Sequence, residues 1–258
     1  MEVDISPSSA KRNVLNMRGI SKVYRTDMLE THALRNVSLT VGVGEFVAVM
    51  GPSGSGKSTF LNITGLLDTF DTGTYELDGT DVRGLSDRER ARLRNERIGF
   101  VFQNFNLIAD LNIRDNVEVP LRYRRMPAAQ RRENIDAALD LVGLGARGRH
   151  LPGQLSGGQQ QRAAIARALA AEPSFLLADE PTGNLDSTAV RQIMDLFEKV
   201  NAMGTTIVMV THDPNLARRA HRQVHIVDGQ LADQGLAREG SPAAAPNLSR
   251  LALHEPGH

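Results

Sequence analysis

The sequence contains no cysteine, which excludes disulfide bonds and cysteine-bound metal. No apolar run approaches the ~20 residues that cross a bilayer, and the first residues lack the apolar region of a secretory signal. Neither sign of charge is in excess, because 30 Lys and Arg residues balance 30 Asp and Glu residues. This balance does not favour nucleic acid or an anionic membrane surface as the main partner. We therefore expect a cytoplasmic chain whose local sites carry its function.

What is present is enough for one sizeable domain. The chain has 258 residues, of which 41% are hydrophobic, so it can bury a substantial core. Residues 1–13 are polar, and residues 236–258 are rich in Ala and Pro, so we expect tails at both ends, the C-terminal one disordered. The pattern predicts a folded domain over residues 14–235.

Short apolar runs alternate with helical patterns along this domain. The runs at 46–50, 175–178 and 206–210 are each followed by an amphipathic segment, which is typical of parallel strands with crossover helices. We therefore predict an α/β fold with a parallel sheet, and an antiparallel β edge formed by residues 16–41. An Arg-rich, mostly helical stretch at about 85–153 predicts an inserted helical subdomain.

A glycine-rich loop follows the first apolar run. It fits the pattern G-x-x-x-x-G-K-[ST] and lies between a strand and a helix, which is the context that a phosphate-binding loop requires. Its backbone N–H groups and the helix N-terminus would face the phosphates. Lys57 would reach the β- and γ-phosphates, and the Ser58 hydroxyl would bind Mg²⁺. The candidate residues are Gly51, Ser53, Gly54, Ser55, Gly56, Lys57, Ser58 and Thr59.

Polar residues stand at the ends of three other predicted strands. Asp179 and Glu180 follow an apolar strand, so they should lie at the carboxyl edge of the sheet, where α/β proteins bind ligands. We expect Asp179 to hold Mg²⁺ and Glu180 to act as the base that activates water. His212 would hydrogen bond to the γ-phosphate, and the Gln103 amide would contact the metal or the attacking water.

The N-terminus of a second predicted helix is also suited to bind an anion. The run Leu155-Ser156-Gly157-Gly158-Gln159 precedes it, with Ser156 as its expected N-cap. Capping explains the serine but not the two glycines, which leave open amide donors at the helix N-terminus. The chain has only one phosphate loop, so we expect a symmetric homodimer in which each copy presents this helix to the nucleotide of the other.

The order of these motifs resembles the ATP-binding-cassette (ABC) ATPase family over residues 14–232. The resemblance implies an ATP-hydrolysing domain with a RecA-like parallel core, binding ATP and Mg²⁺. It also implies that Tyr24 stacks on adenine, that Gln103 belongs to the Q-loop, and that Ser156 to Gln159 form the signature. Asp186 would connect the two sites, and His212 would be the switch histidine.

A finer resemblance concerns the segment after Gln103. Residues 102–108 and 111–121 are similar to the subfamily that includes lipoprotein-releasing and macrolide-export ATPases. This implies a separate membrane permease subunit that holds the chain at the cytoplasmic face of the inner membrane. We predict a docking groove near 103–107, with Phe105 and Leu107 as its apolar anchors.

Three other functions stay open at this point. A soluble cassette acting on DNA or ribosomes would need long heptad arms or a second cassette, and the sequence has neither. The chain could instead transmit conformational work to an external enzyme without moving a substrate. The last alternative is a module that binds phosphate without hydrolysing ATP. It differs from an ATPase in that Glu180 would not act as a base.

Overall fold

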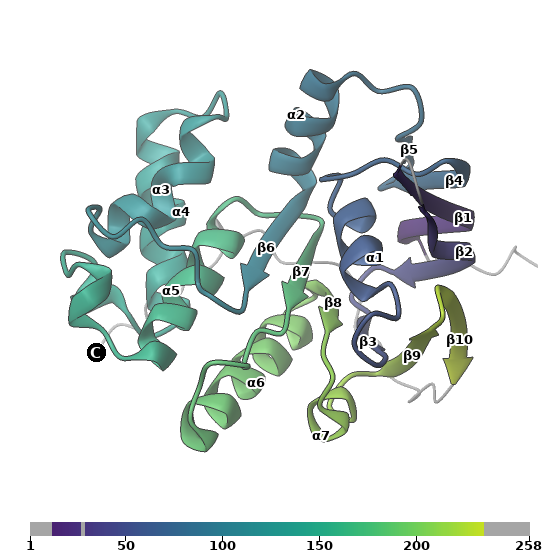
Figure 1. Ribbon diagram of the computed structural model, residues 1–258. Helices are drawn as coiled ribbons and strands as arrows, with labels where there is room; N and C mark the ends of the chain where they lie inside the picture. The colour runs from purple at the N-terminus through teal and green to yellow at the C-terminus, as the bar shows by residue number, and fades with distance from the viewer. Residues whose placement is uncertain (1–11, 27–28, 235–258) are drawn as a thin grey trace, which may run out of the picture.

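The computed structural model describes residues 12–26 and 29–234, which form two β-sheets and their covering helices (Figure 1). The larger sheet has six strands, and five of them run parallel as predicted. β10 is antiparallel and closes a hairpin with β9. In spatial order the strands are β10 (Gln230–Gln234), β9 (Arg222–Val227), β3 (Phe46–Met50), β8 (Thr206–Val210), β7 (Phe175–Asp179) and β6 (Ile98–Phe102).

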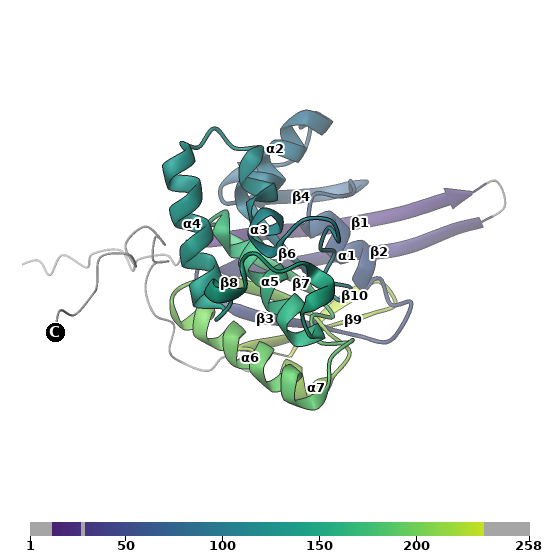
Figure 2. The same ribbon diagram turned by 90° about the vertical axis from the view of Figure 1, so that its left-hand side faces the viewer.

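The smaller sheet is antiparallel and is built mostly from the early β-rich stretch. Its order is β2 (Leu29–Gly42), β1 (Asn13–Thr26), β4 (Thr72–Leu77) and β5 (Thr80–Asp81). The predicted antiparallel pairing is confirmed, but β1 and β2 join this second sheet and do not pair with the parallel strands. They alternate buried and exposed residues, and the buried ones face a shared core. Figure 2 shows the β1–β2 hairpin projecting beyond the rest of the molecule.

Seven helices are found in the described residues, and most follow a strand. Helix α1 begins at Lys57, directly after the glycine-rich loop, as the sequence predicts. Five of the others (α2, α3, α5, α6 and α7) begin after a Ser, Asn or Asp whose side chain accepts a backbone N–H, which satisfies one of the free donors of the first turn. The helices are α1 (Lys57–Thr64), α2 (Asp87–Arg97), α3 (Ile113–Arg122), α4 (Ala128–Leu141), α5 (Gly157–Ala170), α6 (Ser187–Ala202) and α7 (Pro214–Ala217).

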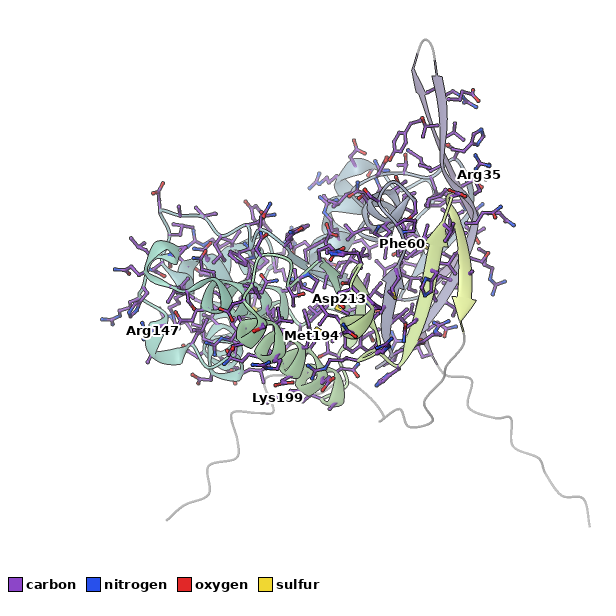
Figure 3. All side chains as sticks on the ribbon, turned by 60° about the horizontal axis from the view of Figure 1, so that its bottom comes forward. Arg35, Phe60, Arg147, Met194, Lys199 and Asp213 are labelled. Atoms are coloured by element: carbon purple, nitrogen blue, oxygen red, sulfur yellow. The ribbon has the colours of Figure 1, made fainter. Side chains whose placement is uncertain are left out.

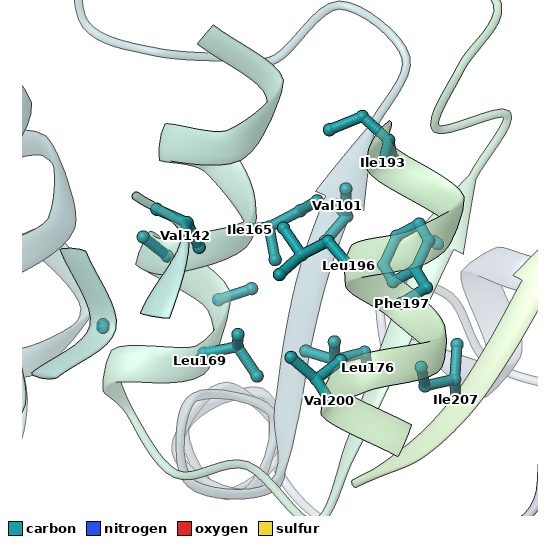
Figure 4. Close-up of a cluster of buried hydrophobic side chains, with 14 of the residues drawn as sticks. Val101, Val142, Ile165, Leu169, Leu176, Ile193, Leu196, Phe197, Val200 and Ile207 are labelled. Atoms are coloured by element: carbon teal, nitrogen blue, oxygen red, sulfur yellow. The ribbon is translucent and has the colours of Figure 1, made fainter. Parts of the chain in front are cut away.

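The two faces of the six-stranded sheet bury different cores. Strand β3 shows the division, because Val47 and Val49 face one core while Ala48 faces the other. The first core lies between the two sheets and includes Phe60 of α1. The second lies under α3 to α6, where side chains of α5 and α6 interlock with those of the sheet (Figure 4). Phe60 in the first core and Met194 of α6 in the second are labelled in Figure 3.

The Arg-rich stretch contains α2, α3 and α4, which agrees with its helical pattern. α3 and α4 contribute to the core formed with α5, whereas β6, inside the same stretch, pairs with β7 at the edge of the large sheet. The limits of 85–153 for a subdomain therefore stay a prediction. The predicted tails lie almost entirely outside the described residues. Within 12–26 and 29–234, every helix is too short or too polar to span a bilayer.

Candidate functional site

The glycine-rich loop packs so closely on its neighbours that side chains are excluded at two positions. A Cβ on Gly51 would lie 2.1 Å from the Ile226 carbonyl oxygen of β9, and one on Gly56 would lie 2.4 Å from the Ala33 carbonyl oxygen of β2. Gly54 differs, because a Cβ there would meet nothing within 4 Å. The outer glycines thus fit the loop against the two sheets, while the middle of the loop faces open space that an anion can enter.

The Lys57 ammonium group lies across this loop. Its Nζ donates to the carbonyl oxygens of Gly51 and Pro52, each at 2.7 Å. The Ser55 side chain is buried, and its hydroxyl has no hydrogen-bond partner in the structure. The N-terminus of α1 adds its partial positive charge at the same place. These features together form a site for the phosphates of a ligand.

A pocket of about 610 Å³ opens beside the loop and brings together five of the predicted residues: Gly51, Ser53, Lys57, Glu180 and His212. It also contains His225, which the sequence analysis missed. His225 lies within β9 and pairs in the parallel register with Met50, the last residue of β3. Two more residues of β9 follow it, so the strand-end rule that found Glu180 gives no signal for His225 in the sequence. The pocket is lined by Met50, Gly51, Pro52, Ser53, Lys57, Glu180, His212 and His225.

The two acids differ in their surroundings. The Glu180 carboxylate lies 2.8 Å from the His212 Nδ1 and accepts a weaker bond from the Thr211 hydroxyl at 3.4 Å. Burial raises the pKa of Asp179, the negative charge of Glu180 raises it further, and Lys57 opposes both. Glu180 also has a φ of 43°, a left-handed backbone that is uncommon outside glycine. The strand end therefore turns sharply, which places a histidine-bound carboxylate beside a desolvated one.

Gln103 lies against the segment that follows Glu180. Its side-chain nitrogen donates to the Asn184 Oδ1 at 3.2 Å, and the Asn184 nitrogen donates back to the Gln103 carbonyl oxygen at 3.3 Å. A Cβ on Gly183 would lie 2.6 Å from the Gln103 side-chain nitrogen, so the glycine admits this contact. Gln103 thus connects the end of β6 to the turn after β7 and is not among the residues that line the pocket.

The N-terminus of α5 is capped from within its own first turn. The Ser156 hydroxyl accepts from the Gln159 N–H at 3.4 Å, and the Gln159 side chain accepts from the Ser156 N–H at 3.0 Å, which forms a capping box. Gly158 allows α6 to approach, because a Cβ there would lie 2.9 Å from the Ala189 Cβ. Asp186 caps α6, accepting from the N–H groups of Thr188 and Ala189 at 2.9 and 2.8 Å. This packing gives one of the two unexplained glycines a structural role.

The loop helix α1 and the helix α5 lie on opposite faces of the large sheet. α1 contributes Phe60 to the core between the sheets, and α5 contributes Ile165 to the core on the other side. None of the residues Ser156 to Gln159 lines the pocket that contains Lys57. In Figure 1, α5 lies with α3 and α4 to the left, and α1 lies beside the small sheet to the right. The structure thus separates two motifs that were both predicted to contact nucleotide.

A groove of about 1190 Å³ lies near the predicted docking segment, between α2, β6, α3 and α5. Its apolar floor comes from Phe100 and Phe102, whose rings stack at 5.5 Å. Phe105 and Leu107 do not line it: Leu107 packs on the core below, and Phe105 lies beside Gly157. The groove is present, but the two predicted anchors are not part of it.

Comparison with known proteins gives a consistent result. The family described as ABC transporter matches residues 34–183. The macrolide export ATP-binding/permease protein MacB 1/2 of Paracoccus denitrificans is 48% identical over 234 residues, which are 90% of this chain and 35% of that protein. The lipoprotein-releasing system ATP-binding protein LolD of Bordetella avium is 48% identical over 218 residues, 84% of this chain and 95% of that protein. The chain therefore spans about a third of the first relative and nearly all of the second.

Solved structures agree with the sequences. A dimeric, post-hydrolysis state of the ATP-binding cassette MJ0796 bound to ADP and Pi superimposes with a TM-score of 0.78 at 43% identity, covering 87% of this chain and 99% of that one. CbiO1 of Clostridium perfringens, part of the transporter complex CbiONQ, superimposes with a TM-score of 0.79 at 28% identity, covering 87% of this chain and 89% of that one. With its phosphate loop, carboxylate pair and capped α5, the chain belongs to the ABC transporter family, as an ATPase cassette of that family.

Proposed function

We propose that two copies of this chain close around two ATP molecules, that each ATP lies between the phosphate loop of one copy and the α5 N-terminus of the other, and that hydrolysis reopens the pair. The observation that carries this proposal is the placement of α1 and α5 on opposite faces of one sheet. A helix N-terminus that cannot reach the pocket of its own chain can reach that of a symmetry mate. The dimeric cassette with ADP and Pi supports this arrangement.

In this proposal each pocket residue has one task. Lys57 exchanges its bonds to the Gly51 and Pro52 carbonyls for the β- and γ-phosphates. Glu180 accepts a proton from the attacking water, and His212, bonded to it at 2.8 Å, holds the carboxylate in place and faces the γ-phosphate. Asp186 and the Ser156 to Gln159 turn meet the nucleotide of the partner copy. ATP drives closure because it binds the closed pair more tightly than the open one.

The oxygen atoms near the pocket fit Mg²⁺. Asp179 has a carboxylate with a raised pKa, because it is buried and lies near the charge of Glu180, and a divalent cation would relieve both effects. Ser58 lies exposed in the first turn of α1, and its hydroxyl is a suitable ligand. The Gln103 nitrogen already bonds to Asn184, which leaves the amide oxygen as the atom for a metal. When bound, Mg²⁺ would neutralise charge on the β- and γ-phosphate oxygens.

We further propose that the chain powers a separate membrane permease, which keeps it at the inner face of the membrane. The name of the MacB relative, an ATP-binding/permease protein of which this chain matches 35%, supports a permease as the partner. The LolD relative, an ATP-binding protein matched over 95% of its length, supports a cassette on a chain of its own. The groove between α2, β6, α3 and α5 is the docking surface that the structure offers. Its wall includes Arg88 and Arg125, which are exposed and form no ion pair within the described residues, so it suits a permease segment with acidic residues.

The docking proposal is tested by charge reversal in the groove. The double variant Arg88→Glu with Arg125→Glu should hydrolyse ATP as the parent does when isolated, yet lose the permease during purification from gently solubilised membranes. Arg147→Glu with Arg149→Glu is the matched control, because these arginines are exposed between α4 and α5 and do not line the groove (Figure 3 labels Arg147). Retention of the permease by the groove variant would contradict the docking surface, and recovery with ribosomes or DNA alone would favour the soluble cassette.

A further inference from the structure

The Tyr24 side chain is held by two neighbours although it is 40% exposed. Its hydroxyl donates to the Asp68 Oδ2 at 2.7 Å, and Asp68 lies in the segment that follows α1. The Lys22 ammonium group donates to the other Asp68 oxygen at 3.0 Å and lies 5.1 Å from the centroid of the Tyr24 ring. Two side chains from two separate segments therefore hold one aromatic ring in place.

Asp68 is suited to be the permanent acceptor in this arrangement. Burial alone would raise its pKa, but hydrogen bonds from Tyr24, Lys22 and the Thr69 backbone outweigh burial and hold the pKa below its ordinary value. Lys22 is itself buried, with 8% of its surface exposed, whereas the Asp68 side chain is 29% exposed, so the ion pair is shielded from water on the lysine side only. The carboxylate thus stays charged at neutral pH, and a charged acceptor makes the bond from Tyr24 stronger than a neutral one would.

The ring lies next to the phosphate loop. The Thr59 side chain, in the first turn of α1, lies near the Tyr24 hydroxyl. Lys22 approaches one face of the ring, as in a cation–π pair, which leaves the opposite face for a planar group. A flat base attached to phosphates in the loop is such a group, and aromatic faces stack well on it.

We infer that Asp68 is a positioning residue for the nucleotide base: it anchors the Tyr24 hydroxyl, Lys22 covers one face of the ring, and the free face receives adenine. This inference rests on the proposed function, because it specifies how the ATP of that site is held. Asp68 does not touch the reacting atoms. Its effect should appear in the affinity for the base and not in the affinity for the phosphates.

A double-mutant cycle on the full chain tests the inference. Asp68→Ala should weaken ATP binding about three- to tenfold, the loss expected when one hydrogen bond of typical net strength is removed. Tyr24→Phe should cause a similar loss, and the double variant should lose little more, because both changes remove the same bond. Binding of tripolyphosphate, which has no base, should stay unchanged in all three. Additive losses, or an equal loss of tripolyphosphate binding, would overturn the inference.

Two further variants make the result specific. Asp71→Ala is the matched control, since its carboxylate accepts from the Val23 backbone at 2.7 Å and so removes a bond between the same two segments without releasing Tyr24. Asp71→Ala should leave the ratio of the dissociation constant for ATP to that for tripolyphosphate at the parental value. Tyr24→Ala separates the two proposals: no loss of ATP affinity would reject stacking on Tyr24 itself, whereas a loss without any effect of Asp68→Ala would reject only the role of Asp68.

Discussion

The phosphate pocket and the α5 N-terminus are the two anion-seeking regions of this molecule, and they differ in completeness. The pocket joins Lys57, Glu180 and His212 from three segments of the chain. The α5 N-terminus has only the bonds of its own capping box and the close packing of α6. Folding of one chain assembles the pocket, whereas the α5 N-terminus has no residue of the pocket beside it in the same chain. If the proposed dimer forms, the fold of one chain supplies most of each site, and the α5 N-terminus of a second copy supplies the remaining wall.

The largest effect should come from Glu180→Gln, which keeps the shape of the assembled region but removes its base. Phosphate release should fall by about 10²- to 10⁴-fold, the usual contribution of a positioned base, while ATP still binds. Glu133→Gln, at an exposed position of α4, is the control and should behave as the parent does. Unchanged turnover in Glu180→Gln would remove Glu180 from its assigned role and revive the phosphate-binding module.

A mixing experiment separates the two regions most sharply. Lys57→Ala damages only the pocket, and Ser156→Arg damages only the α5 N-terminus, so neither homodimer retains an intact composite site. A mixed dimer contains one intact site, formed by the Lys57 of one copy and the Ser156 of the other. ATP hydrolysis should therefore reappear when the two inactive proteins are combined. A mixture that releases no phosphate would contradict a site shared between two copies.

Within the pocket, the two histidines offer a finer comparison. His212→Gln should lower turnover about 10²-fold, as the loss of one preorganised hydrogen-bond donor does, because His212 is bonded to Glu180. His225→Gln should have a smaller effect. His225 lines the pocket from β9, but the histidine bonded to Glu180 is His212. Steady-state rates of the two variants at saturating ATP make the comparison. Equal losses would place His225 in the reaction.

The smallest effect concerns stability and follows from the raised pKa of Asp179. Above that pKa the ionised carboxylate is less favourable in the folded chain than in the unfolded one, so Asp179→Asn should raise the Tm at neutral pH in the absence of nucleotide. The gain should shrink as the pH falls through the raised pKa and vanish below about 3.9, the ordinary Asp value. Thermal unfolding of both proteins across this range is the measurement, and a gain independent of pH would contradict the charge explanation.

Much of this architecture was readable in the sequence. The strand bounds at 46–50 and 206–210, the start of α1 at Lys57 and the Ser156 cap all agree with the pattern, because apolar runs, helix caps and glycine loops are local signals. The roles of the individual site residues stay predictions.

Other features could not be read in this way. The separate small sheet depends on which strands pair over long distances. His225 lies inside β9, and only its register with Met50 brings it to the pocket. The bond between Tyr24 and Asp68 joins residues 44 positions apart. Such contacts are set by tertiary packing, which a single sequence does not display.

The most direct test of the account is the mass of Glu180→Gln in solution. Light scattering on this variant, saturated with ATP and Mg²⁺, should give twice the mass of one 28.1 kDa chain, and the same protein without nucleotide should give the single mass. A single mass under both conditions would contradict the claim that ATP joins two copies, each completing the pocket of the other.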